Sequence, residues 1–311
     1  MTPGVSVIIP VYDGARLVGQ AIDSALRQSL APLEIVVADD GSGDSTPRVL
    51  AGYGERIRVL RLPHGGVAQA RNAAIAASRG ELLAFLDADD LWHRNKLSQQ
   101  VAALRHWPQA GLCCCDYLVE HREHGQLMRH FEQALPRAGL HPNQPLVTQP
   151  VPALIRCNFV GTASNVLMRR TLAQQAGLFD PRYRQAEDYD YWLRCARLAP
   201  FVLLDAPLLD KRRHAYNLTN NALETAQCHE QVLLALAQRG TLPPDHLALL
   251  NEALSQIRFG IARQLAMRGA AQPALGYCLR GWHSHQSLAN FGRAARTAAR
   301  CLLLLRSAVR S

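Results

Sequence analysis

Three aspartates that could bind a cation stand together, directly after an apolar run at 82–86 that is typical of a buried strand. They are Asp87, Asp89 and Asp90. Carboxylates this close repel one another unless a cation lies among them, and Mg²⁺ and Mn²⁺ prefer such oxygen ligands. The same residues are also typical of an acidic helix start ahead of 92–106. The sequence therefore predicts a divalent metal site or, failing that, a helix N-terminus.

A second acidic segment, 39–45, follows another strand-like run at 33–38. Carboxylates at Asp39 and Asp40 could accept hydrogen bonds from a base imide or a ribose hydroxyl. Aspartate, glycine and serine in this order are equally typical of a tight turn that leads into a helix. From the residues alone, both interpretations stay open.

The segments that must position these motifs alternate between strand and helix. Strand-like runs lie at 5–9, 33–38, 57–62, 82–86, 164–169 and 201–204, and helical patterns at 15–29, 68–78, 170–176 and 188–198. This alternation predicts an α/β fold with a mostly parallel sheet, whose ligands bind outside the carboxyl ends of the strands. Five prolines between 136 and 152 predict a loop or insertion over 119–152.

The formal net charge of +9 is concentrated at the end of the 311-residue chain. Residues 253–311 hold nine arginines and no acidic residue, whereas 1–252 hold equal numbers of acidic and basic side chains. The chain is expected to be helical from about residue 219 onward. The spacing of apolar residues and arginines over 287–311 predicts an amphipathic helix that lies on an anionic membrane surface. Packing of that helix on the protein or on a second subunit is the alternative. Nucleic acid is not an expected partner, because aromatic residues are not interleaved with the charges.

Composition excludes several classes of protein. No apolar run approaches the roughly 18–20 residues of a membrane span. The start of the sequence lacks the basic segment of a secretory signal. The eight cysteines contain no CxxC pair, so reduced and mostly buried thiols in a cytoplasmic protein are expected.

Five motifs together resemble glycosyltransferase family 2. They are 5–12 (VSVIIPVY), 39–42 (DDGS), 65–72 (GGVAQARN), 87–90 (DADD) and 187–194 (EDYDYWLR). The resemblance implies a GT-A fold, which is a Rossmann-like, mixed and mostly parallel sheet flanked by helices, here with a C-terminal helical tail. It implies a catalytic domain over 1–225, with a nucleotide-binding half at about 1–118 and an acceptor half at about 155–225. Residues 226–311 would form a helical basic extension.

The resemblance also assigns roles to individual residues. Nucleotide binding falls to Pro10, Val11, Tyr12, Asp39, Asp40, Arg71 and Asp87, metal binding to Asp89 and His214, general-base catalysis to Asp188, and acceptor binding to Glu187 and Trp192. The residue types alone also allow a purely structural role for some of these residues. Glu187 and Asp188 also suit a helix N-terminus, Trp192 a packed core, and His214 a surface position.

The implied activity is an inverting, metal-dependent glycosyl transfer with Mg²⁺ or Mn²⁺. The expected donor is a UDP-sugar first and a dTDP- or GDP-sugar next, and the acceptor is a glycan or a polyprenyl-linked oligosaccharide. The expected setting is surface polysaccharide or O-antigen synthesis in the cytoplasm, at the inner membrane face if the tail docks there. A processive synthase is not expected, because no Gln-x-x-Arg-Trp segment is present.

Two other functions are alternatives to glycosyl transfer. A nucleotidyltransferase would need a basic, glycine-rich loop after the first strand, and 11–15 (VYDGA) contains no basic residue. A non-catalytic glycan-binding or membrane-associated scaffold protein that retains the fold stays open.

Overall fold

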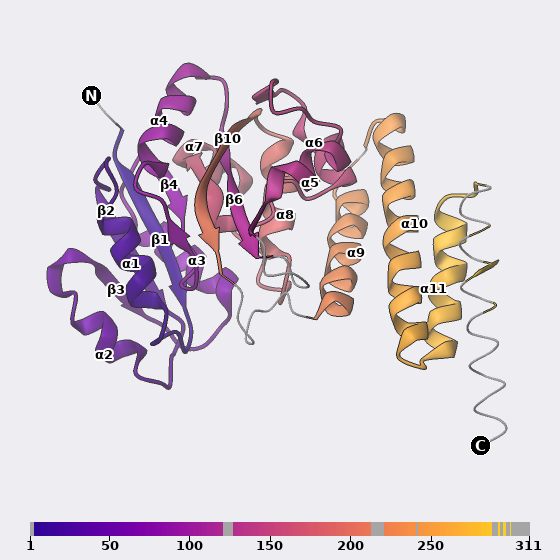
Figure 1. Ribbon diagram of the computed structural model, residues 1–311, viewed down its shortest axis with the longest axis horizontal. Helices are drawn as coiled ribbons and strands as arrows, with labels where there is room; N and C mark the ends of the chain where they lie inside the picture. The colour runs from indigo at the N-terminus through magenta and orange to yellow at the C-terminus, as the bar shows by residue number, and fades with distance from the viewer. Residues whose placement is uncertain are drawn as a thin grey trace. The chain divides into compact units, whose positions relative to one another are not determined.

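The computed structural model describes residues 3–120, 127–212, 221–240 and 242–287, together with 292, 295, 296 and 299. The chain divides into two compact units, Met1–Ala215 and Tyr216–Ser311. The first unit is an α/β layer structure and the second is helical (Figure 1).

The strands of the first unit form one ten-stranded sheet in the order β3-β2-β1-β4-β9-β6-β10-β5, with β7 beside β6 and β8 beside β10. Their bounds are β1 Val5–Val11, β2 Glu34–Asp39, β3 Arg58–Arg61, β4 Leu82–Phe85, β5 Leu91–Trp92, β6 Leu112–Glu120, β7 Leu127–Arg129, β8 Leu146–Val147, β9 Val166–Arg169 and β10 Phe201–Lys211. Strands β1 to β4 are mutually parallel, and β9 runs antiparallel to both β4 and β6. Because β10 is parallel to β6, the carboxyl ends of β1–β4, β6 and β10 share one edge. The predicted α/β class with a mostly parallel sheet is confirmed.

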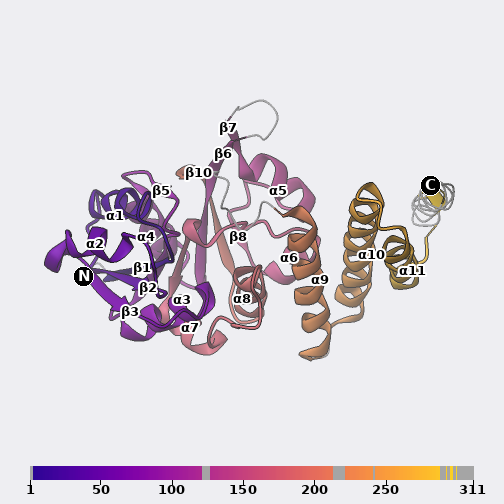
Figure 2. The ribbon, with the colours of Figure 1, turned by 90° about the horizontal axis from the view of Figure 1, so that it is seen from below.

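Helices cover both faces of this sheet (Figure 2). They are α1 Val18–Leu26, α2 Thr46–Ala51, α3 Val67–Ala77, α4 Lys96–His106, α5 His130–Ala138, α6 Pro150–Arg156, α7 Arg170–Ala176 and α8 Glu187–Ala196. Alternate residues of β1, such as Val7 and Ile9, pack with Val18 and Ile22 of α1. Side chains alternate across a strand, so the residues between them face α3. Burial on both faces explains why β1 and β4 are apolar throughout.

Aromatic rings anchor α8 to the α3 face of the sheet. Phe85 of β4 meets Phe179 edge-on at a centroid distance of 5.7 Å and Trp192 at 6.0 Å. Tyr191 stacks on Phe179 at 3.9 Å. Trp192 has no exposed surface. This cluster fixes the helix whose first turn carries Glu187.

The prediction of a loop over 119–152 is wrong for the described part of that stretch, which contains β7, α5, β8 and the start of α6. Pro136 is the seventh of nine residues in α5, so only a late helical hydrogen bond is lost. The helix gains more by burying Phe131 and Leu135. Pro150 occupies the first turn of α6, where a missing N–H costs nothing. Prolines at these two positions are compatible with a helix and do not mark its end.

The second unit contains α9 Ala222–Gln238, α10 Pro244–Met267 and α11 Ala271–Ser284. The predicted helical character is confirmed over these residues. Arg258 of α10 pairs with Glu230 of α9 at 2.5 Å, and Ser255 Oγ donates to the Gly281 carbonyl of α11 at 2.7 Å. The predicted amphipathic helix over 287–311 lies almost entirely outside the described residues.

Among the described helices, none combines the length and the apolar character that a membrane crossing requires.

A lysine lies buried beneath the sheet. Lys96 at the start of α4 has no exposed surface, and its Nζ lies 4.0 Å from the Trp92 ring centroid and donates to Gln100 Oε1 at 2.8 Å. Burial lowers the pKa of Lys96 to about 8 from the ordinary 10.5. Between those two pH values the unfolded chain binds the extra proton, so this group makes stability rise with pH.

We predict that Lys96→Met is more stable than the wild type near pH 7, because it removes a buried charge. The difference should shrink between pH 8 and pH 10.5 by up to about 1.4 kcal/mol per pH unit. Urea unfolding of both proteins at pH 7, 8.5 and 10 measures it. A difference that stays constant or grows with pH would contradict the assignment.

Candidate functional site

The motif residues gather at the edge where the parallel strands end. Pro10 and Val11 are the last residues of β1 and are buried, while Tyr12 just beyond them is half exposed. Asp39 ends β2, and Asp87 lies two residues beyond β4. Ligands of open α/β sheets bind at such an edge.

Asp39 and Asp40 are each 3% exposed and already accept hydrogen bonds. Asp39 Oδ1 accepts from the Ser42 N–H at 3.0 Å. The two carboxylate oxygens of Asp40 accept from the backbone N–H groups of Gly65 and Gly66, at 2.9 and 2.8 Å. Asp40 therefore ties the loop after β3 to the end of β2, and any contact to a nucleotide uses its remaining lone pairs.

Arg71 of α3 joins two elements that are far apart in sequence. Its side chain is 4% exposed, and its Nη2 donates to Asp87 Oδ1 at 2.7 Å while Nη1 donates to Glu187 Oε1 at 2.5 Å. The guanidinium carbon lies 5.4 Å from the Phe179 ring centroid. Its Nε has no hydrogen-bond partner within the described part of the chain. A single buried cation thus links the segment after β4 to the first turn of α8.

The shared arginine leaves the two carboxyl groups with different pKa values. Burial alone would raise the pKa of Asp87, but the charges of Arg71 and Lys211 and the Arg71 hydrogen bond lower it overall. Glu187 is more deeply buried, and burial with the neighbouring Asp188 charge raises the pKa of Glu187 to about 6 despite Arg71. Asp87 is therefore the stronger acid of the pair and stays ionised at neutral pH.

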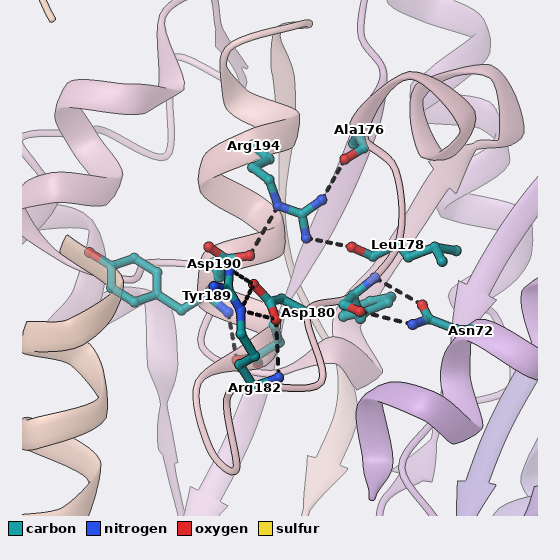
Figure 3. A network of polar contacts seen from close by, with 10 residues as sticks. Asn72, Ala176, Leu178, Asp180, Arg182, Tyr189, Asp190 and Arg194 are labelled. Atoms are coloured by element: carbon teal, nitrogen blue, oxygen red, sulfur yellow. Dashed lines mark hydrogen bonds and ion pairs between the residues drawn. The ribbon is translucent and has the colours of Figure 1, made fainter. Parts of the chain in front are cut away.

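Polar contacts hold α8 and α3 to the segment 176–180 (Figure 3). Arg194 Nε bonds to Asp190 Oδ2 at 3.0 Å, and the same side chain donates to two backbone carbonyls of the segment. Asn72, next to Arg71, donates to the Phe179 carbonyl and accepts from the Phe179 N–H, each at 2.8 Å. Both helices that carry site residues are thereby fixed to the same piece of chain.

The turn into α8 uses an uncommon backbone conformation. Ala186 has φ 64° and ψ 19°, in the left-handed region that a residue with a side chain rarely adopts. This turn places Glu187 inside and leaves Asp188 half-buried, with its Oδ1 accepting from the Tyr189 N–H at 2.7 Å. Such conformations persist where surrounding contacts hold them, often at functional sites.

The acidic group after β4 carries excess negative charge. Asp90 is 2% exposed, and burial with the charges of Asp89 and Asp87 raises the pKa of Asp90 to about 8. Its Oδ1 accepts from the Arg212 N–H at 3.2 Å, whereas its buried Oδ2 has no hydrogen-bond partner among the residues described. Arg212 Nε also donates to the Asp89 carbonyl.

These carboxylates fit a hard divalent cation. A cation would relieve the repulsion and satisfy the orphaned Asp90 oxygen. No three His, Cys, Asp or Glu side chains of the described chain are grouped so that they could hold a metal alone. Mg²⁺ sites in proteins often use one or two carboxylates, and substrate phosphates then complete the coordination. His214 lies outside the described residues.

Most of the predicted site residues gather at this edge, and Trp192 lies elsewhere. Tyr12, Asp39, Asp40, Arg71, Asp87, Asp89, Glu187 and Asp188 lie there. Trp192 has no exposed surface and packs in the core against Phe85. Its alternative interpretation, a packed core residue, agrees with that position. The individual roles stay predictions.

Sequence reasoning missed several residues that hold the site. Ser164 Oγ accepts from the Asp87 N–H at 3.0 Å, and Thr162 Oγ1 donates to Asp87 Oδ2 at 3.4 Å. Neither lies in a recognisable motif, because they approach Asp87 only through the β4–β9 pairing. Arg212 lies in the basic run 211–213, and that run could have drawn attention to it.

The mostly parallel sheet flanked by helices is similar to that of GT-A glycosyltransferases, and the acidic motif lies at the carboxyl-end edge of its strands. The sequence model for glycosyl transferase family 2 matches residues 6–166, and the chain belongs to this family. It is 29% identical over 271 residues to an uncharacterized glycosyltransferase of Rickettsia prowazekii (strain Madrid E), covering 86% of this chain and 81% of that protein.

Two solved structures share the fold. S. aureus TarS 1-349 in complex with UDP-GlcNAc superposes with a TM-score of 0.69 at 16% identity, covering 99% of this chain and 92% of TarS. The mannosyltransferase PcManGT from Pyrobaculum calidifontis, in complex with GDP-Man and Mn²⁺, gives a TM-score of 0.62 at 21% identity. That match covers 100% of this chain and 87% of PcManGT.

We predict that Arg71→Ala lowers the free energy of unfolding by about 3–5 kcal/mol, because it leaves the buried Glu187 and the half-buried Asp87 without their cation. Arg71→Lys should recover only part of the loss, since one ammonium cannot bond both carboxylates as the planar fork does. Urea denaturation at pH 7 measures both, and the control is Arg27→Ala, at an exposed residue directly after α1. Wild-type stability in Arg71→Ala would show that the bridge does not hold the two elements together.

Proposed function

We propose that the chain is an inverting, metal-dependent glycosyltransferase that moves a sugar from a nucleotide-sugar donor to a hydroxyl of a glycan or polyprenyl-linked acceptor. The observation that carries the proposal is the Arg71 bridge, which joins Asp87 of the acidic motif to Glu187 beside Asp188. Donor-binding and proton-accepting carboxylates are thereby held in one site.

The donor is proposed to bind along the edge from β1 to β4. Tyr12 and the Asp39–Asp40 turn lie at the nucleoside end, and Asp87 lies at the ribose and diphosphate end. A UDP-sugar is the first candidate, with dTDP- and GDP-sugars next. TarS with UDP-GlcNAc and PcManGT with GDP-Man support a nucleotide-sugar of this kind.

Asp89, with the neighbouring Asp90, would hold Mg²⁺ or Mn²⁺ beside the diphosphate. When bound, such an ion neutralises the charge that grows on the leaving nucleoside diphosphate. Arg71 is buried and paired, so its part is to hold Asp87 and Glu187 in place. The Mn²⁺ in the PcManGT structure supports this assignment.

Asp188 is proposed as the general base. Its carboxylate takes the proton of the acceptor hydroxyl while that oxygen attacks the anomeric carbon and the sugar–phosphate bond breaks. A single displacement inverts the anomeric centre. Glu187 positions the acceptor side of the site from its buried place beside Arg71.

The proposed setting is bacterial surface polysaccharide or O-antigen synthesis at the cytoplasmic face of the membrane. The run of nine arginines without acidic residues over 253–311 supports contact with an anionic leaflet. A catalytic domain over about 1–225 and a basic helical extension beyond it are part of the same proposal.

We predict that the protein binds one of UDP, dTDP or GDP sugars in the presence of Mn²⁺, and that EDTA abolishes the binding. Asp89→Ala should weaken it at least about tenfold, because the diphosphate charge then lacks its ion. Calorimetry with a donor panel measures this, and Asp245→Ala in α10 is the exposed matched control. Equal binding with and without metal would remove the cation from the proposal.

Asp188→Asn should keep donor affinity and lose about 10²–10⁴-fold in turnover, because the amide cannot accept the proton. Product release from the donor sugar identified in the panel measures turnover, and NMR of the product should show an inverted anomeric configuration. Near-normal turnover in a folded Asp188→Asn protein would overturn the base assignment. Donor binding without any turnover in the wild type, across glycan and polyprenyl acceptors, would favour the scaffold alternative.

A further inference from the structure

Two exposed aromatic rings lie side by side at the carboxyl-end edge. Tyr12 follows β1 and His64 follows β3, and their ring centroids are 4.2 Å apart with an interplanar angle of 31°. The exposed fraction is 51% for Tyr12 and 58% for the His64 side chain. A ring pair outside the core offers a planar ligand a surface for stacking.

Asp40 fixes the orientation of the His64 ring. Nδ1 of His64 lies 2.9 Å from Asp40 Oδ2 and 3.1 Å from the Asp40 carbonyl oxygen. Both oxygens are acceptors, so this bonding assigns the proton to Nδ1. Nε2 then lies on the far side of the ring from Asp40 and makes no hydrogen bond within the described part of the chain.

The loop that carries His64 is set in place before any ligand arrives. The N–H groups of Gly65 and Gly66 donate to the same Asp40 carboxylate. Gly41, with φ 77°, packs so closely that a Cβ there would lie 2.8 Å from the His64 backbone nitrogen. Preorganisation of this kind lowers the entropy lost on binding.

We propose that His64 is a nucleobase-binding residue. Its ring and that of Tyr12 form the surface on which the base of the donor nucleotide stacks, and Asp40 is the positioning residue that holds the ring. The inference rests on the proposed function, because it takes the nucleoside diphosphate of the donor as its ligand. The base is the planar, uncharged part of that donor. The diphosphate would bind at the acidic motif after β4 instead, beside the proposed metal ion.

The test compares a nucleotide with a ligand that lacks a base. The probes are inorganic pyrophosphate with Mg²⁺ and whichever of UDP, dTDP and GDP the wild type binds most tightly. Their Kd values are measured by calorimetry for the wild type, His64→Ala and His64→Phe. His106→Ala is the matched control, because His106 also contacts an aromatic ring, that of Trp107, but at the opposite edge where β6 begins.

His64→Ala is expected to raise the Kd of the nucleotide about tenfold or more, in line with the loss of one base–aromatic stack. His64→Phe should recover most of that affinity, and the Kd of pyrophosphate should be the same in all variants. With a competent acceptor, KM for the donor should rise while kcat stays unchanged.

An unchanged nucleotide Kd in His64→Ala would overturn the proposal, and so would equal weakening of nucleotide and pyrophosphate. Failure of His64→Phe to bind better than His64→Ala would also overturn it, since the ring would then not be the binding element. A wild type that binds pyrophosphate but none of the three nucleotides would instead refute the proposed function itself.

Discussion

The site depends on one buried guanidinium. Arg71 lies between Asp87, which follows β4, and Glu187, which begins α8, with almost no access to water. A buried charge is tolerated only when it is paired, and the arginine and its two carboxylates pair with one another here. This mutual requirement fixes the separation between the acidic motif and the helix that carries Asp188.

The surroundings of Arg71 explain why this arrangement can persist. Phe179 and Trp192 exclude water on the α8 side, and Asn72 ties the adjoining segment to α3 through both of its amide atoms. The left-handed turn at Ala186 opens the same helix, and the Ala186 carbonyl accepts from the Asp190 N–H at 3.1 Å. Loosening the aromatic cluster would therefore lower the stability of the protein and also release the two carboxylates from their positions.

Local sequence patterns predicted much of the architecture. Apolar runs located β1 to β4, and Gly177 marked the end of α7, because strand burial and helix ends are set mainly by neighbouring residues. Local sequence patterns gave a wrong prediction where tertiary packing determined the secondary structure. Pro136 lies inside α5, since burial of that helix face outweighs one lost hydrogen bond. The central strand β6, with its three consecutive buried cysteines, was not predicted as a strand.

The sequence by itself determined the class of the protein, the motif residues and the edge at which they gather. These follow from residue type and from the rule that parallel strands end together. Only the tertiary structure decided which side chains touch. Trp192 lies in the core although Glu187 and Asp188 of the same helix lie at the carboxyl-end edge, because the helical period places Trp192 on the face that packs against Phe85. His64 came to lie on Tyr12 because Asp40, which follows another strand, holds its loop there. Contacts between residues distant in sequence depend on packing, which no local pattern encodes.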